Sequence, residues 1–338
     1  MNSYQNPLSL GYYPFPETSI PAHVERLKED AEGWLDNDYT FLTASERRLY
    51  KIANLAYTTI RMLPNENTSY ERMKPAVRWM VAVTVSDDYY ELSTREEIKH
   101  AAERVRSILL GADPLPDEMA FFHQYAIMRD EYQAFMPNEW MERMAKDMYE
   151  YLLFGIREMT AYTATGTRPN LAVYSIIREF DVAVIPFMNF VECEIGFTLP
   201  KHVVDHPVIQ RIRSLMGKII GFQNDFYSLE KESVRGTSKV PCDLIRVMED
   251  EYGLTFGEAC KESLRFHDAC VTEFVALQSA LPDFGSINKD IENYALHMGI
   301  GIQGLNTWYH LDTLRYKPDG YRDIEKRDSI LPENEIFL

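Results

Sequence analysis

The chain has 338 residues, of which 46% are apolar, and its 52 acidic against 35 basic side chains leave a formal net charge of −17. A chain of this length and apolar content can bury a large core, which argues against intrinsic disorder. The negative charge opposes nucleic-acid binding, because that affinity depends largely on lysine and arginine side chains that neutralise phosphates.

Residues 1–22 are rich in proline and tyrosine and lack a helical period, so they predict an extended N-terminal strap over the surface. Helical periodicity begins near Ala22 and continues through most of the chain. Capping boxes predict helix starts at residues 43–46, 93–96 and 255–258. The breaks between helical stretches are short and the composition does not shift. This favours one all-α domain over residues 1–338, with residues 317–338 as a C-terminal tail.

The expected cellular compartment is inferred from the lack of a recognisable targeting or membrane-spanning segment and from the cysteine pattern. The first residues show no basic start followed by an apolar run, and no segment is long enough to span a bilayer. The four cysteines form no CxxC pair and are expected to be free thiols. We therefore expect a cytoplasmic protein without stable membrane insertion.

An acidic motif follows an apolar run. Residues 81–86 are apolar or small and lead into Asp87, Asp88 and Glu91. On a helix, Asp87 and Glu91 are one turn apart, with Cβ atoms about 5–6 Å apart on the same face. Like charges at this distance repel, and Mg²⁺, which binds carboxylate and phosphate oxygens, would compensate them. An exposed acidic helix end is the ordinary alternative for this motif taken alone.

A second polar stripe follows the helical run 215–222. Asn224, Ser228 and Glu232 are spaced four residues apart, so an amide oxygen, a hydroxyl and a carboxylate share one helix face. Oxygen donors of this kind suit magnesium, and Lys231 could reach a phosphate oxygen as a point charge. A solvated polar helix face is the alternative, although Glu and Lys pairs are more usual there.

The two motifs together resemble those of class I terpene synthases of the bacterial or fungal type, with similarity from roughly residue 34 to residue 316. Residues 87–91 look like the family's aspartate-rich motif, and residues 224–232 fit its N-D-x-x-S-x-x-x-E metal motif. The resemblance implies a single-domain helical bundle around a central apolar cavity, three Mg²⁺ ions, an isoprenyl diphosphate substrate and a homodimer. By the same resemblance Asp87 bridges two ions, while the Asn224 stripe holds a third. Glu91 stands where the family often has Asp.

Further residues match the same family. Arg178 resembles its diphosphate-sensing arginine, and Asp181 and Val182 resemble its linker and effector positions, where the helix breaks and a backbone carbonyl faces the substrate. Arg315 and Tyr316 resemble the pair that hydrogen-bonds the diphosphate in the closed site. The residues expected to grip the diphosphate are therefore Arg178, Lys231, Arg315 and Tyr316.

The carbocation formed by ionisation needs a dry, electron-rich wall, since an aromatic face stabilises a desolvated cation by about 0.5–2 kcal/mol. The wall candidates are Trp308 first, then Phe154, Phe180 and Phe187. Val83 and Thr84 lie one turn before Asp87 and are small, which narrowly favours a C20 geranylgeranyl chain over a C15 farnesyl chain.

Three alternatives compete with a terpene cyclase, a carbon–oxygen lyase that would release diphosphate and form a hydrocarbon or an alcohol. Residues 299–304 spell the dinucleotide-binding pattern G-x-G-x-x-G, but their flanks are predicted helices, so close helix packing explains these glycines better. A chain-elongating prenyl transferase also uses magnesium, yet that family's resemblance implies a second aspartate-rich motif, which the Asn224 stripe replaces here. A non-catalytic helical scaffold or lipid-binding protein is the third alternative.

Overall fold

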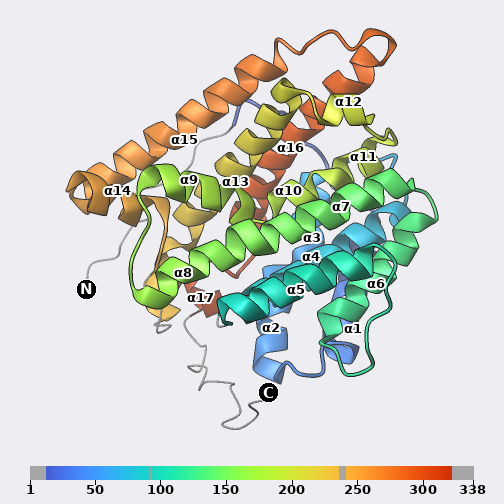
Figure 1. The fold of residues 1–338 in the computed structure, drawn as a ribbon, viewed down its shortest axis with the longest axis horizontal. Coiled ribbons are helices and arrows are strands. Elements are labelled where there is room, and N and C mark those ends of the chain that lie inside the picture. The colour runs from blue at the N-terminus through green and yellow to red at the C-terminus, as the bar shows by residue number, and fades with distance from the viewer. Residues whose placement is uncertain (1–12, 92, 236–240, 322–338) are drawn as a thin grey trace.

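Helices form all of the regular structure in residues 13–91, 93–235 and 241–321, which are the residues that the computed structural model describes. The first half of the chain forms α1 (Val24–Asn37), α2 (Ala44–Ala53), α3 (Leu55–Met62), α4 (Tyr70–Tyr90), α5 (Arg95–Leu109), α6 (Ala120–Gln133), α7 (Asn138–Glu150), η1 (Tyr151–Ile156) and α8 (Arg157–Thr165). The second half forms α9 (Leu171–Asp181), α10 (Val184–Phe187), α11 (Asn189–Ile195), α12 (Lys201–Val204), α13 (Pro207–Arg235), α14 (Leu244–Tyr252), α15 (Phe256–Gln278), η2 (Gly285–Ile287), α16 (Asn288–Leu311) and α17 (Pro318–Tyr321). The all-α prediction is confirmed, and Figure 1 shows the long helices packed side by side.

Capping residues explain where several helices begin. Thr43 and Glu46 exchange the two hydrogen bonds of a capping box at the start of α2, and residues 255 and 258 do the same at the start of α15, as predicted. The box before α5 lies one residue later than predicted. Thr94 has the extended backbone of an N-cap, so its partner is Glu97.

The cavity of the molecule is bounded by helices from both halves of the chain. Helix α4 is buried on most of its surface, as its apolar run requires, and it packs against α3 and α6. The segment η1 is a π-helix that joins α7 to α8, and it packs against α9. Such wide turns are often found at functional sites. Here Gly155 permits the contact, because a Cβ atom at this position would lie 2.6 Å from the Cα atom of Asp181.

Two glycines of the 299–304 segment allow α16 to approach α3 closely. A Cβ atom on Gly304 would lie 1.8 Å from the carbonyl oxygen of Arg61, and one on Gly301 would lie 3.2 Å from that of Met62. Helix α16 runs without interruption through this segment. Helix packing therefore accounts for these glycines, as predicted, and a dinucleotide-binding turn does not.

The segment before α1 packs against α13, α15 and α16. The side chains of Tyr13 and Phe15 are buried, and the backbone N–H of Tyr13 donates to Gln303 of α16. The Tyr13 hydroxyl accepts a hydrogen bond from Gln223 of α13 and contacts His267 of α15 at 2.9 Å. The rest of the predicted strap, residues 1–12, lies outside the described residues, as do residues 322–338 of the predicted tail.

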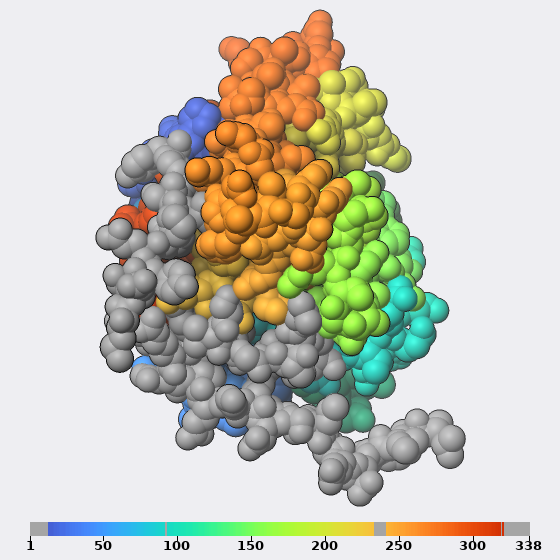
Figure 2. Space-filling view, turned by 90° about the vertical axis from the view of Figure 1, so that its left-hand side faces the viewer, coloured from blue at the N-terminus to red at the C-terminus, as the bar shows by residue number. Residues whose placement is uncertain are grey.

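The surface near α9 is completed by the helices that follow α13. Figure 2 shows α14 and α15, in orange, beside the green region that contains α8 and α9, and α14 contacts α9 directly. Among the described helices, none combines the length and the apolar character that a membrane crossing requires.

Candidate active site

One cavity lies between α3, α4, α8, α9, α13 and α16, and it has a polar and an apolar end. The charged residues and polar motif residues that border it are Asp87, Asp88, Glu91, Arg178, Asp181, Asn224, Asp225, Lys231, Glu232, Arg315 and Tyr316. Further residues with a hydroxyl or thiol group also line it, namely Thr58, Thr84, Tyr151, Thr160, Thr163, Cys242 and Tyr309. The apolar lining includes Leu55, Met62, Trp79, Met80, Val83, Val184, Phe187, Ile220, Leu305 and Trp308. The structure thus brings the two polar motifs, far apart in the sequence, to the same opening.

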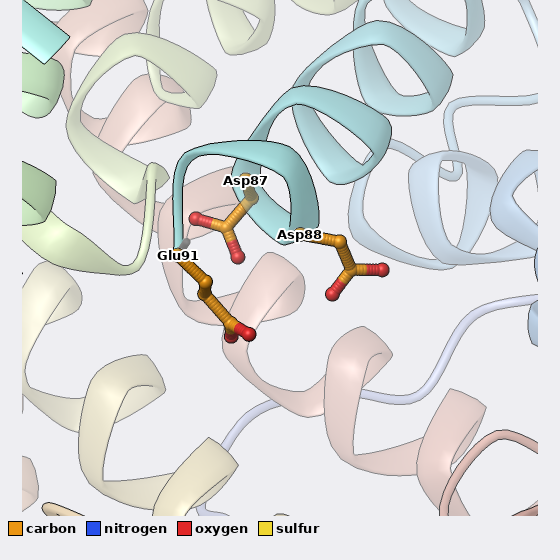
Figure 3. Close-up of side chains that lie close together, drawn as sticks. All are labelled: Asp87, Asp88 and Glu91. Atoms are coloured by element: carbon orange, nitrogen blue, oxygen red, sulfur yellow. The ribbon is translucent and has the colours of Figure 1, made fainter. Parts of the chain in front are cut away.

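Three carboxylates cluster at the C-terminal end of α4. Oxygen atoms of Asp87, Asp88 and Glu91 lie within 4.8 Å of one another, and Figure 3 shows Asp87 beside Glu91, with Asp88 directed to the other side. The Tyr151 hydroxyl donates to Asp87 over 2.8 Å. Loss of hydration raises the pKa of Asp87 well above its ordinary value, and the charges of neighbouring carboxylates raise it further. Such a group of hard oxygen donors fits a divalent cation like Mg²⁺.

The second motif lies on α13, across the cavity. Asn224 donates to the hydroxyl oxygens of Tyr309 and Tyr316, over 2.8 and 3.2 Å. Lys231 and Glu232 border the cavity, and the Lys231 ammonium lies 5.0 Å from the centre of the Tyr316 ring. Ser228 is buried one turn after Asn224, but it is not among the residues that line the cavity.

Arg178 connects α9 with α13. Its guanidinium donates to Asp225 over 3.0 Å, to Asp181 over 2.8 Å and to the amide oxygen of Asn224 over 2.8 Å. Helix α9 ends three residues later, and Ala183 has a positive φ of 57°, which an L-residue with a Cβ atom rarely adopts. Arg178 is therefore linked both to the second motif and to the break that precedes α10.

Asp225 is a site residue that the sequence analysis missed. Its side chain is 2% exposed and accepts hydrogen bonds from Arg178, from the Tyr174 hydroxyl over 2.6 Å and from the backbone N–H of Leu244 over 3.2 Å. Burial raises its pKa to about 7, although the positive charge of Arg178 opposes this shift. The only signal in the sequence was its place beside Asn224 in the second motif.

Arg315 and Tyr316 contact both the acidic motif on α4 and the second motif on α13. Arg315 donates to both oxygens of Asp88, over 3.0 and 3.2 Å, and the Tyr50 hydroxyl donates to the same carboxylate over 2.9 Å. Tyr316 accepts a hydrogen bond from Asn224 and packs edge to face against Trp308. The segment after α16 thus joins the end of α4 to α13.

The predicted wall residues divide into two groups. Trp308, Phe187, Val83 and Thr84 border the cavity, as does Val182, the predicted effector. The indole N–H of Trp308 donates to the carbonyl oxygen of Ala53 over 3.0 Å, which holds this side chain in the wall.

The prediction of two other wall residues is wrong. Phe154 and Phe180 pack edge to face against each other with ring centres 5.7 Å apart, and neither borders the cavity. In η1 it is Gly155 that faces the end of α9, and its neighbour Phe154 is 43% exposed.

The chain is similar to several known proteins. A family model described as terpene synthase family 2, C-terminal metal binding, matches residues 78–273. The chain is 25% identical to a (+)-T-muurolol synthase ((2E,6E)-farnesyl diphosphate cyclizing) of Roseiflexus castenholzii, over 90% of this chain and 93% of that protein. It is 24% identical to a 7-epi-alpha-eudesmol synthase ((2E,6E)-farnesyl diphosphate cyclizing) of Streptomyces viridochromogenes, over 87% and 86% of the two chains.

A solved structure supports the fold. The crystal structure of 2-methylisoborneol synthase from Streptomyces coelicolor, in complex with Mg²⁺ and 2-fluoroneryl diphosphate, aligns with a TM-score of 0.78. The alignment covers 90% of this chain and 96% of that one at 18% sequence identity. At this level of identity the likeness concerns the fold alone, and it agrees with the helical bundle and central cavity described above.

Proposed function

The chain belongs to terpene synthase family 2, whose C-terminal metal-binding model matches residues 78–273, and on this premise we propose that this cyclase acts on farnesyl diphosphate with Mg²⁺ as its cofactor. The observation that carries the proposal is the two-ended cavity, in which polar motifs and arginines surround one end and apolar side chains the other. An isoprenyl diphosphate has the same two parts, a charged head and a hydrocarbon chain.

The oxygen donors at the polar end support a magnesium site. We propose that the ions, three in number as the family resemblance implies, are held by Asp87, Asp88, Glu91, Asn224, Ser228 and Glu232. Carboxylate, amide and hydroxyl oxygens are hard ligands of the kind that Mg²⁺ takes. When bound, Mg²⁺ neutralises the charge of the diphosphate and so favours its departure from the allylic carbon.

The basic side chains bind the leaving group. Arg178 and Arg315 each pair with a carboxylate in this structure, and a diphosphate offers them several charged oxygens for charge-assisted, bidentate hydrogen bonds. Lys231 adds a point charge and Tyr316 a hydroxyl donor at the same end of the cavity. Because Arg178 also holds Asp181, diphosphate binding is linked to the end of α9 and to Val182, the proposed effector.

The apolar end receives the hydrocarbon chain and excludes water from the cation. The faces of Trp308 and Phe187 supply negative electrostatic potential there. Val83 and Thr84 are small, but Trp79 and Phe187 fill the same region, with ring centres 5.9 Å apart. This bulk removes the reason for preferring a C20 chain, and the named relatives that cyclise farnesyl diphosphate support a C15 substrate.

The proposal is tested by incubating the protein with Mg²⁺ and either farnesyl or geranylgeranyl diphosphate, and by measuring released diphosphate and extracted products. We expect a terpene from the C15 substrate and at least about tenfold lower kcat/KM with the C20 substrate. Asp87→Ala and Asn224→Ala should abolish turnover. Asp205→Ala is the matched control, because this exposed carboxylate pairs only with Lys201 among the described residues and should leave turnover unchanged.

The same experiment separates the alternatives. A prenyl transferase would form longer diphosphates when isopentenyl diphosphate is added, and a scaffold or lipid-binding protein would release no diphosphate. Turnover that survives removal of Mg²⁺ with a chelator, or full activity of Asn224→Ala, would contradict the proposed site.

A further inference from the structure

The last carbonyl groups of α2 accept hydrogen bonds from residues 308–316, which we call the C-terminal segment. A helix leaves its final carbonyl oxygens without partners inside the helix. In α2 the carbonyl oxygen of Ala53 accepts from the indole N–H of Trp308 over 3.0 Å. The carbonyl oxygen of Ile52 accepts from the backbone N–H of Leu314, also over 3.0 Å. The end of α2 therefore contacts the C-terminal segment at two points.

Asn54 ends α2 and contacts the same segment. Its φ of 57° and ψ of 56° are left-handed, a conformation that asparagine adopts more readily than most residues other than glycine. This residue separates α2 from α3, so α2 stops where its last carbonyl groups meet the C-terminal segment. The side-chain amide of Asn54 also donates to the backbone carbonyl oxygen of Asp312 over 3.2 Å.

Arg61 of α3 adds an ion pair to the segment. Its guanidinium donates to both carboxylate oxygens of Asp312, over 2.7 and 3.1 Å. The two side chains are only 16% and 10% exposed, so solvent screens this pair less than a surface pair. Two parallel bonds fix the direction of the carboxylate as well as its distance. Asp312 is thus bound through its backbone by Asn54 and through its side chain by Arg61, and we call this arrangement the Asp312 clamp.

Asp312 lies between the residues of the segment that border the cavity. Trp308 precedes it by one turn at the end of α16, and Arg315 and Tyr316 follow it. The buried Thr313 hydroxyl accepts from the backbone N–H of Arg315 over 3.0 Å, which orders the turn after Asp312. The position of Asp312 therefore determines where the guanidinium of Arg315 enters the site.

We propose that Arg61 and Asn54 are positioning residues, which hold the C-terminal segment so that Arg315 meets the diphosphate. This inference rests on the proposed function. Neither Arg61 nor Asn54 is among the residues that line the cavity, so each acts through Asp312 and not on the substrate. A weaker clamp should lower diphosphate affinity only while Arg315 is present to bind the diphosphate.

The test measures the binding of inorganic diphosphate in the presence of Mg²⁺ by titration calorimetry, which does not depend on turnover. Arg61→Gln removes the charge and the fork, and we expect it to raise the Kd about tenfold, a coupling of ordinary size between residues in one hydrogen-bond network. In an Arg315→Gln background the same change should leave the Kd where Arg315→Gln alone puts it. Arg61→Lys keeps the charge and should restore part of the affinity.

A matched control and a second variant accompany this comparison. Arg104 forms a bidentate pair of similar burial with Glu118, and neither residue lines the cavity, so Arg104→Gln should leave the Kd unchanged. Asn54→Gly keeps the left-handed backbone and removes only the amide, and it should raise the Kd about two- to threefold. If Arg61→Gln does not fold, Asn54→Gly is compared in the two backgrounds in its place.

The outcomes separate this inference from the proposed function. Wild-type affinity in Arg61→Gln, or an equal loss of affinity with and without Arg315, would overturn the positioning role and leave the cyclase intact. A wild-type protein that shows the expected coupling but releases no diphosphate from farnesyl diphosphate would contradict the cyclase and leave the clamp standing. A wild-type protein that binds no diphosphate would contradict both.

Discussion

The close contact between α16 and α3 makes Gly304 sensitive to a single added methyl group. In Gly304→Ala the new Cβ atom would lie 1.8 Å from the carbonyl oxygen of Arg61, whereas ordinary contacts begin at 3.4 Å. The obstacle is backbone, so the two helices would have to separate by more than 1 Å. We expect the free energy of unfolding to fall by about 3 kcal/mol or more, with a decrease in Tm of about 5 °C or more in a thermal unfolding experiment.

The control is a helical glycine with open space around it. Gly33 lies inside α1, and a Cβ atom there would meet nothing within 4 Å. Gly33→Ala should therefore stabilise the protein by about 0.5–1 kcal/mol, because alanine is the better helix former. A Gly304→Ala variant as stable as the wild type, or a Gly33→Ala variant that loses stability, would refute the packing argument.

Other variants probe the site and its support. Arg178→Lys should lower kcat about a hundredfold, because a point charge cannot replace a guanidinium fork that bonds three partners; unchanged kinetics would exclude a diphosphate-binding role. Trp308→Leu should change the product mixture or the rate, and an identical mixture formed at an identical rate would remove this residue from the cation wall. Tyr13→Phe leaves Gln223 and His267 without the hydroxyl they contact, so the free energy of unfolding should fall by about 1–3 kcal/mol. A wild-type melting curve for Tyr13→Phe would show that the hydroxyl does not support α13.

Helical periodicity predicted which motif residues share a face, except that Ser228, which was predicted on one stripe with Asn224 and Glu232, does not line the cavity. Asp87 lies in the last turn of α4 and Glu91 caps the C-terminal end of this helix, one turn later. Oxygen atoms of the two carboxylates lie within 4.8 Å of each other. Asn224 and Glu232 are two turns apart on α13, and both border the cavity. These relations depend only on the geometry of a single helix, so the spacing of residues in the sequence is enough to predict them.

The parts that could not be predicted depend on tertiary contacts or on irregular turns. The π-helical turn of η1 contains more residues than an α-helical turn, so the phase of the helix shifts and Phe154 lies on the outer side. The pairing of Arg315 with Asp88 joins residues 227 positions apart. The bonding of Asp225 to the start of α14 likewise follows from how helices pack, and no spacing within the sequence encodes it.

The hydrogen bond from Tyr13 to Gln303 has a consequence for how the protein forms during synthesis. The two residues are 290 positions apart, and α16, which carries Gln303, also supplies one side of the cavity. A nascent chain lacking α16 leaves the apolar faces of α3 and α13 uncovered, since both pack against that helix. The chain must therefore emerge from the ribosome past α16 before a competent enzyme can assemble, and until then it passes through an aggregation-prone stage.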